Sequence, residues 1–423
     1  MKFEKKTFKN GLRAIVAPMK DTQAATLWVL FGTGSKYETK RLNGVSHFLE
    51  HLFFKGTKHR PKAGQLNLEL DRLGAQSNAF TSKEYTGYYV KAAAKHFDTA
   101  LDIVSDILLE PLFKKEEIEK ERGVILQEIS MYEDDPRRQA ADIFEELLYG
   151  DQPAGWDTAG YPETVKNIMR EDIIKYKESH YLTSSAVVTV AGNIESEEVF
   201  RKIEKAFSKM PRGRKLEKSK VKEHQRAPAV KFKKKDVDQT HIRLGVRSYD
   251  MYDERRYALS VLNTIIGGNW SSRLFMELRE KLGLTYYVRS FAEEYTDTGY
   301  LMAAAGVPHA TMPQAAKKIV EVFRVAKTKG VSEREISFAK EYIRGQTALA
   351  FESSDEVAAF LSSQELFYKK IMTPEEILAK IERVKKSDIM KIARDLFRPE
   401  KLNLAAIGPQ EDIAPYKKIL QTL

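Results

Sequence analysis

The chain contains no cysteine and no long apolar run, and each absence excludes a class of protein. Without a cysteine among its 423 residues, it can form no disulfide-stabilised fold, cysteine-ligated zinc, iron–sulfur cluster or thiol nucleophile. No apolar stretch approaches the ~20 residues that cross a bilayer, so we expect no membrane span. The first residues, MKFEKKTFKNGLRAIV, show neither a signal-peptide core nor a transit segment, and we expect a cytoplasmic protein. A metal in this chain must be bound by His, Asp or Glu.

Excess positive charge is absent outside one segment. The formal net charge is +10, but residues 211–235 alone hold eleven Lys or Arg and two Glu. The two bodies on either side are therefore close to neutral. The segment lacks the repeated interleaving of aromatic residues that stack on bases, so we expect no nucleic-acid partner. A solvated linker is the favoured interpretation, and a docking patch for an acidic partner is the alternative.

The two halves that flank this basic segment repeat each other. Three residue pairs occur at one constant offset of 216 positions: Asp172 and Asp388, Tyr181 and Phe397, and Gly192 and Gly408. Matches at a single offset indicate a tandem duplication of one unit of about 200 residues. We predict homologous domains at residues 1–211 and 230–423, joined by a basic linker at 212–229.

Each half mixes strand and helix patterns. A hairpin is expected around the turn at Asn10-Gly11. Period-2 patterns predict strands at residues 24–31, 84–92 and 186–191, and the period of 3.6 predicts helices at 44–55, 64–73, 97–109 and about 115–148. Because strands and helices follow one another without a βαβ rhythm, we predict an α+β fold. Each of the two tandem domains would be a mainly antiparallel sheet with helices packed on one face.

The strongest chemical signal lies in residues 44–57, which read GVSHFLEHLFFKGT. His47 and His51 are one helical turn apart on the same face, with Cβ atoms ~5–6 Å apart, so two imidazoles can reach one zinc. Glu50 lies on the adjoining edge, where it can hydrogen-bond a water at the metal. This is the inverzincin arrangement His-x-x-Glu-His. The alternative is a satisfied pair of surface histidines, but burying them among apolar neighbours without a partner would be costly.

A catalytic zinc needs three protein ligands and one open position. No other histidine lies in an obvious site, so we expect a carboxylate as the third ligand. The helix EEIEKERGVILQEISMYEDD offers several candidates. Glu116, Glu117 and Glu119 lie in a charged stretch typical of solvent-exposed residues, whereas Glu128 interrupts an apolar run. Spacing alone favours Glu128 only modestly.

Over essentially its whole length the chain resembles the pitrilysin/insulinase-type (M16) zinc metallopeptidases, in particular their half-size, processing-peptidase-like branch. The motif HFLEH and a glutamate 77 residues beyond His51, in ERGVILQEI, are the residues that establish the resemblance. It implies that Glu128 is the third ligand of one Zn²⁺ per chain, and that Glu121 orients the ligands. It also implies a zinc metalloendopeptidase of short, unfolded peptides, in which Glu50 would accept and deliver protons.

The same resemblance extends to substrate-binding residues. The segment SSRLFMELREKLGLTYYV (residues 271–288) matches a pattern whose Arg–Tyr pair, here Arg279 and Tyr286, holds substrate near the zinc. Taken without the family, Arg279 would be an ordinary helix-surface arginine and Tyr286 a strand core residue. The strand that pairs with substrate corresponds to QSNAFT. Its candidate contact residues are Asn78, Ala79 and Phe80.

The resemblance also implies an assembly. Four homologous domains enclose a chamber in the family and this chain supplies two, so we expect a homodimer, with a heterodimer with an M16 homologue as the alternative. The second half has Asn263 near the place of His47 and no HxxEH, so only the first half is expected to bind zinc. Two other functions stay open. One is a non-catalytic structural or regulatory subunit of a heterodimer, and the other is a binding protein that acts through the basic linker.

Overall fold

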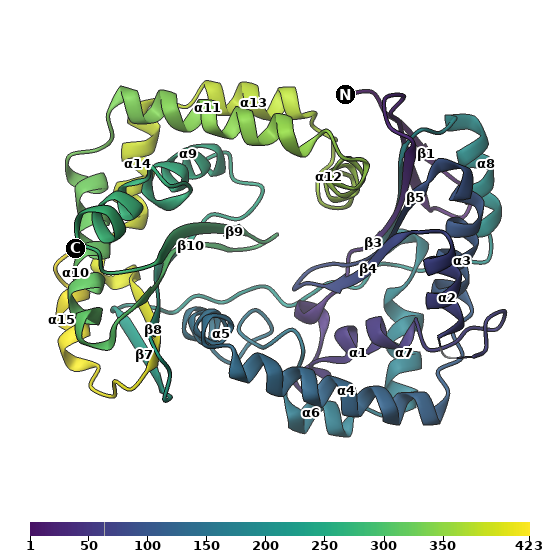
Figure 1. Cartoon of the computed structure of the whole chain (residues 1–423), viewed down its shortest axis with the longest axis horizontal. Helices are drawn as coiled ribbons and strands as arrows, with labels where there is room; N and C mark the ends of the chain where they lie inside the picture. Colours follow the sequence, from purple (N-terminus) through teal and green to yellow (C-terminus); the bar gives the residue numbers. More distant parts are fainter. Residues whose placement is uncertain (63) are drawn as a thin grey trace. The chain divides into compact units, whose positions relative to one another are not determined.

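The structure, a computed structural model, describes residues 1–62 and 64–423 and divides into two compact units. The first unit consists of Met1–Ile129, Asp157–Ser219 and Thr347–Thr373. The second consists of Ser130–Trp156, Lys220–Gln346 and Pro374–Leu423. Each unit contains one sheet and the helices that pack on it (Figure 1).

Apart from the additional edge strand β1 (Glu4–Thr7) of the first sheet, the two sheets have the same topology. The first runs in the order β1, β2 (Arg13–Pro18), β6 (Ala186–Gly192), β3 (Ala24–Phe31), β5 (Thr86–Ala93) and β4 (Gln76–Thr81). The second runs in the order β7 (Ala229–Lys234), β11 (Asn403–Gly408), β8 (Thr240–Ser248), β10 (Gly299–Val307) and β9 (Tyr287–Glu294). In each sheet one pair is parallel, β2 with β6 and β7 with β11, and the remaining pairs are antiparallel. The predicted α+β fold of two homologous tandem domains is therefore confirmed.

Residues paired in the sequence repeat have the same structural role in both units. The carboxylates of Asp172 and Asp388 each accept a hydrogen bond from the backbone N–H three residues earlier, at 3.0 and 2.9 Å, and so cap a helix. Gly192 and Gly408 each end the strand that is parallel to its neighbour. Duplication of the sequence is thus matched by duplication of local structure.

Helices surround both sheets. The first half of the chain forms α1 (Val45–Leu52), α2 (Gln65–Arg72), α3 (Phe97–Leu109), α4 (Lys115–Asp134), α5 (Pro136–Tyr149), α6 (Pro162–Asn167), α7 (Arg170–His180) and α8 (Ser196–Ala206). The second half forms α9 (Arg256–Gly267), α10 (Met312–Thr328), α11 (Glu333–Ala350), α12 (Ser354–Phe367), α13 (Pro374–Glu382), α14 (Lys386–Leu396) and α15 (Ala414–Leu420), with a π-helix at Phe275–Lys281. None of the helices within the described ranges is long and apolar enough to cross a membrane.

Each sheet also packs against a helix from the other half of the sequence. Helix α12 covers β3 and β6 of the first sheet, and α5 covers β11 and β8 of the second. Side chains alternate along a strand, so in β2 Ile15 and Ala17 join the cluster with α12 while Ala14 and Val16 are buried on the opposite face. The contiguous domains expected at 1–211 and 230–423 do not include this exchange. In the structure, α12 belongs to the first compact unit and α5 to the second.

The exchanged helix α12 provides a test of packing. Leu361 is fully buried in the apolar cluster between α12 and the first sheet. We expect Leu361→Ala to lower the free energy of unfolding of the first unit by about 2–5 kcal/mol, because it removes buried methyl groups and leaves a cavity. Denaturant titration measures the effect. The control Leu349→Ala alters a leucine that is 64% exposed, and an equal loss in both variants would contradict this packing.

The long helix expected at residues 115–148 is instead two helices, α4 and α5. Pro136 begins α5 and lacks the N–H that a continuous helix would need at that position. Asp135 caps the new helix, since its Oδ1 accepts a hydrogen bond from the N–H of Arg137 at 2.8 Å. The sequence DDP held this signal, and the unbroken apolar periodicity outweighed it in the prediction.

The basic segment is exposed along most of its length, but the solvated interpretation is wrong for two lysines. Lys218 Nζ lies 3.3 Å from Glu84 Oε1, and the Lys218 side chain is 9% exposed. The same carboxylate pairs with the buried Lys36 at 2.8 Å. Burial also lowers the pKa of Lys215. The first part of the linker is therefore fastened to the first unit by its lysine side chains.

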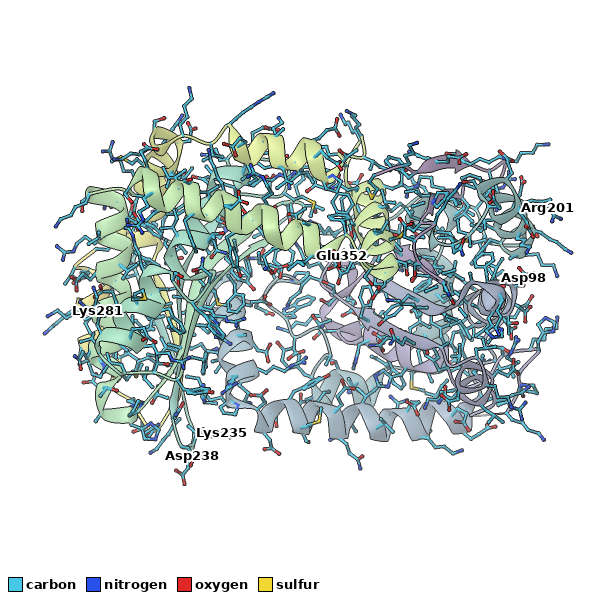
Figure 2. The ribbon with its side chains drawn as sticks, turned by 45° about the horizontal axis from the view of Figure 1, so that its top comes forward. Asp98, Arg201, Lys235, Asp238, Lys281 and Glu352 are labelled. Atoms are coloured by element: carbon cyan, nitrogen blue, oxygen red, sulfur yellow. The ribbon has the colours of Figure 1, made fainter. Side chains whose placement is uncertain are left out.

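An open groove of about 550 Å³ separates α3 from α8 on the first unit. Figure 2 labels Asp98 on α3 and Arg201 on α8, two of the charged residues that line it. Lys202 Nζ lies 2.5 Å from Asp98 Oδ1. The acidic residues of α3 therefore face the basic residues of α8 and form an ion pair across the groove.

Candidate metal centre

The helix that contains the HxxEH sequence begins at a fixed point. The buried carboxylate of Glu38 accepts hydrogen bonds from the N–H groups of Gly44 and Ser46, each at 2.8 Å, and so caps the first turn of α1. The Ser46 hydroxyl lies 2.7 Å from the hydroxyl of Tyr176. Burial raises the pKa of Glu38, while these donors oppose the rise. This polar network and the buried residues Phe48, Leu49 and Leu52 orient the helix.

Three candidate ligands converge on one point in the first unit. Nε2 of His47 and Nε2 of His51 lie 3.3 Å apart. The Oε2 atom of Glu128, on α4, lies 3.3 Å from Nε2 of His51 and 3.6 Å from that of His47. Among the described residues this is the one group of three or more His, Asp or Glu side chains close enough together to hold a metal ion.

The spacing of these three atoms fits zinc. Ligand atoms placed tetrahedrally 2.0–2.1 Å from a zinc ion lie about 3.3–3.4 Å from one another, and the three observed separations are 3.3, 3.3 and 3.6 Å. Two imidazole nitrogens and one carboxylate oxygen are also ligand types that zinc accepts. The donor set would leave a fourth position for water or substrate.

Glu121 lies behind His51. Its Oε2 is 3.2 Å from Nδ1 of His51, and its Oε1 is 2.8 Å from Nζ of Lys55. Burial alone would raise the pKa of Glu121, but the hydrogen bonds from these two groups outweigh burial and lower it. Burial alone would likewise lower the pKa of His51, but Glu121 and Glu128 raise it to about 9. An imidazole held from behind by a carboxylate is the usual arrangement around a metal-bound histidine.

Glu50 is near the three donor atoms and outside the group they form. Its Oε2 accepts a hydrogen bond from Oγ1 of Thr81 at 2.5 Å. Burial raises the pKa of Glu50, although the Thr81 hydrogen bond and the neighbouring His47 and His51 oppose the rise. A carboxylate whose pKa is raised holds a proton more readily than a free carboxylate, which suits it to accept and then release one.

The predicted substrate strand is β4, at the edge of the first sheet, and it contacts α1. Asn78 is exposed, while Ala79 and Phe80 are partly buried. Oδ1 of Asn78 accepts a hydrogen bond from the N–H of Ala79 at 2.9 Å. Phe80 packs against Trp28 and Tyr85, so its side chain contributes to packing within the sheet. Helix α1, which contains the candidate ligands His47 and His51, thus lies beside the edge strand β4.

Arg279 and Tyr286 come together in the second unit. Arg279 belongs to the π-helix. Such helices are rare in proteins overall, but those that occur are often found at functional sites. Its guanidinium lies 5.0 Å from the centre of the Tyr286 ring, and Nη1 donates a hydrogen bond to the Tyr286 carbonyl oxygen at 3.1 Å. Tyr286 is 75% exposed. The strand-core interpretation of Tyr286 is therefore wrong, because the residue precedes β9 and faces away from the core.

The corresponding place in the second unit holds no such donor group among the residues that the structure describes. Asn263, near the place of His47, lies on α9, and its Oδ1 accepts a hydrogen bond from the hydroxyl of Ser290 at 2.6 Å. Its amide oxygen is therefore used within the fold.

Three residues around the centre were missed by sequence analysis. Thr81 is 31 positions from Glu50, Lys55 lies one turn beyond His51, and Glu38 precedes α1. Lys55 could have been found from its i+4 spacing to His51 on one helix face. The contact of Thr81 with Glu50 left no local signal, because it depends on how the chain folds back on α1. Glu38, in contrast, lies only six and eight positions before the two N–H groups that it caps.

Replacing Glu121 tests whether its contact with His51 strengthens metal binding. We expect Glu121→Gln to weaken zinc binding by roughly 10–100-fold, because the neutral amide holds His51 less firmly. Competition with a chromogenic chelator measures the affinity. The matched control Glu119→Gln changes a carboxylate on the same helix that is 58% exposed and pairs with Arg122. Equal affinities in the two variants would show that Glu121 has no role at the site.

Comparisons with known proteins show where this chain belongs. A family model described as insulinase (peptidase family M16) matches residues 14–160, and a model of the peptidase M16 inactive domain matches residues 167–343. The uncharacterized zinc protease YmxG of Bacillus subtilis is 35% identical over 404 residues, which cover 95% of this chain and 97% of that protein. An uncharacterized zinc protease of Streptomyces coelicolor is 34% identical, with 96% of this chain and 89% of that protein covered.

A solved structure agrees with these relatives. The crystal structure of a protease from Helicobacter pylori is 25% identical in sequence, with a TM-score of 0.91, and the match covers 96% of this chain and 99% of that one. The insulinase model matches the part of the chain in which HxxEH and Glu128 lie, and the inactive-domain model matches the part in which Arg279 and Tyr286 lie. The chain is a two-domain, half-size member of peptidase family M16.

Proposed function

We propose that this protein is a zinc-dependent endopeptidase that hydrolyses short, unfolded peptides. The observation that supports it most is the convergence of His47, His51 and Glu128, with separations suited to zinc, beside the buried carboxylate of Glu50. Metal-assisted hydrolysis requires three protein ligands for the metal and, beside them, a base that is not itself a ligand. The zinc-protease names of the relatives support the same choice.

The roles of the residues follow from their positions. His47, His51 and Glu128 would hold one Zn²⁺, which as a Lewis acid polarises the scissile carbonyl and acidifies water. Glu50 takes one proton from the attacking water and later delivers it to the leaving amine, so that the carboxylate is regenerated. Glu121 keeps the His51 ring in place.

The open edge of β4 is the proposed place for the peptide backbone. An extended peptide that adds to this edge would form main-chain hydrogen bonds near Asn78, Ala79 and Phe80. Such bonds do not depend on sequence, so we expect broad specificity. The hydrogen bond between Asn78 and the Ala79 N–H would have to open for a peptide to use that donor.

We assign Arg279 and Tyr286 to binding the substrate and stabilising the charge that develops on its carbonyl oxygen. We further propose that two copies of the chain form a homodimer that encloses a chamber, with this pair completing a site in the partner. The two domains of each chain, at 1–211 and 230–423 and joined by the linker at 212–229, would then together supply half of the chamber. A chamber of this kind admits short, unfolded peptides and excludes folded proteins.

Mixing two inactive variants tests whether sites form between subunits. One chain has Glu50→Gln, and the other has Arg279→Ala with Tyr286→Phe. If sites form between subunits, exchange restores one intact site per mixed dimer, and we expect partial recovery of peptide hydrolysis. No recovery, with subunit exchange shown independently by differently tagged chains, would contradict the proposed dimer.

The proposed activity is tested with a set of quenched fluorescent peptides. We expect hydrolysis that a chelator abolishes and added zinc restores. A zinc-loaded protein that cleaves none of a varied peptide set would contradict the proposal and favour the alternative of a non-catalytic subunit in a heterodimer.

A further inference from the structure

One face of the second sheet has two arginines on either side of a small residue. On the central strand β10, Ala304 is paired with Arg243 of β8 on one side and with Arg289 of β9 on the other. Directly paired residues project from the same face of a sheet. Adjacent strands are about 4.8 Å apart, so the two arginines stand about 10 Å apart with only a methyl group between them. We call Arg243, Ala304 and Arg289 the arginine row.

A third arginine joins this row from α5, which packs on the same face (Figure 1). Arg137 lies in the first turn of α5, and its carbonyl oxygen accepts a hydrogen bond from Nη2 of Arg243 at 3.0 Å. Its guanidinium lies 4.5 Å from the centre of the Tyr287 ring. Tyr287 is paired with Gly306, one row beyond Ala304 on the same face. Three guanidinium groups from β8, β9 and α5 therefore gather in one place within the second unit.

The positive charge of this group is not balanced by ion pairs. Across residues 1–62 and 64–423, none of the three arginines has a carboxylate within ion-pair distance, and Nε of Arg243 is buried without a hydrogen-bond partner. Asp135 acts on Arg243 only from a distance, since its carboxylate accepts hydrogen bonds from the backbone at the start of α5. The neighbouring His241 responds to this charge, because burial, and then Arg137 and Arg243, lower the pKa of His241 to about 4.

We propose that the arginine row and Arg137 bind a carboxylate of the peptide substrate, an inference that rests on the proposed peptidase function. A guanidinium presents a planar pair of donors that matches a carboxylate, and the side chain that separates the two arginines, that of the buried Ala304, is a single methyl group. Arg289 is exposed and accessible, whereas Arg243 is held by the contact with α5. The carboxylate can come from the C-terminus of the peptide or from an Asp or Glu side chain.

The test compares peptides that differ only in charge. Four versions of one peptide are compared. The first has a free C-terminus and an internal Glu, and the second has a C-terminal amide. The third has Gln in place of the Glu, and the fourth has both changes. Their binding to the full-length Glu50→Gln protein is measured by calorimetry, which does not require turnover. We expect removal of the carboxylate that the arginines bind to weaken binding by about tenfold or more. The single change that weakens binding shows whether that carboxylate is the C-terminus or the Glu side chain.

Variants of the row then locate the site. Arg289→Gln, in the same Glu50→Gln background, is expected to bind the charged peptide about tenfold more weakly and the doubly neutral peptide unchanged. Arg289→Lys retains the charge and is expected to restore part of the affinity. The control Arg324→Gln removes an exposed arginine elsewhere on the second unit.

The outcomes separate the two proposals. Equal affinity for charged and neutral peptides, or equal weakening of both by Arg289→Gln, would overturn the carboxylate site whether or not the wild-type protein cleaves peptides. A charge-dependent loss of affinity at Arg289, together with no cleavage by the wild-type protein, would support the carboxylate site and contradict the peptidase.

Discussion

Replacing Glu50 with Gln is expected to lower kcat for peptide hydrolysis by about 10²–10⁴-fold, the usual contribution of a general base. The variant retains the size of the side chain and a group that Thr81 can hydrogen-bond, but the amide cannot accept the proton of the attacking water. Because Glu50 lies outside the donor group of His47, His51 and Glu128, we expect zinc content to stay at one ion per chain. Steady-state kinetics and metal analysis on the same preparation measure both quantities.

A control tests whether the loss of activity is specific to position 50. Glu116→Gln makes the same chemical change at an exposed position of α4, and we expect it to leave kcat unchanged. Full activity in Glu50→Gln would require another proton acceptor and would contradict the assigned role.

Replacing His51 with Ala is expected to remove both zinc and activity. The change leaves two of three donors, and it also removes the group that Glu121 holds at 3.2 Å. We expect a larger loss of zinc affinity than the roughly 10–100-fold that follows from losing an outer hydrogen-bond partner, and so close to no zinc after dialysis. Atomic absorption of the dialysed protein, with circular dichroism to verify the fold, is the measurement.

His59→Ala is the matched control for this variant. His59 is an exposed histidine of the same unit and lies outside the group of candidate ligands. We expect it to retain zinc and activity. Retention of one zinc by His51→Ala would show that the metal is bound elsewhere.

The fold could be predicted where the signal is local or repeated. The offset of 216 positions between Gly192 and Gly408 indicated two copies of one unit, and both glycines end equivalent strands. The exchange of α5 and α12 could not be predicted, because an amphipathic pattern shows that a helix buries one face but not which sheet covers it. The break at Pro136 is encoded in the sequence DDP, but the apolar period continues on both sides of it and favours one long helix.

The candidate site divides in the same way. The geometry of His47, Glu50 and His51 follows from the spacing of one helix. Glu128 is 77 positions from His51, so the spacing favours it only modestly over the other carboxylates of α4, and the family resemblance is what implies that it is the third ligand. The contact of Thr81 with Glu50 arises from long-range folding and leaves no local pattern, whereas Glu38 lies only six and eight positions before the N–H groups that it contacts at the start of α1.

The most direct test of the proposed centre is zinc-edge anomalous diffraction from crystals of the zinc-loaded protein. We predict one peak per chain, about 2.0–2.2 Å from Nε2 of His47, Nε2 of His51 and a carboxylate oxygen of Glu128. A zinc peak bound by other residues, or the absence of zinc from a protein that still hydrolyses peptides, would contradict the account.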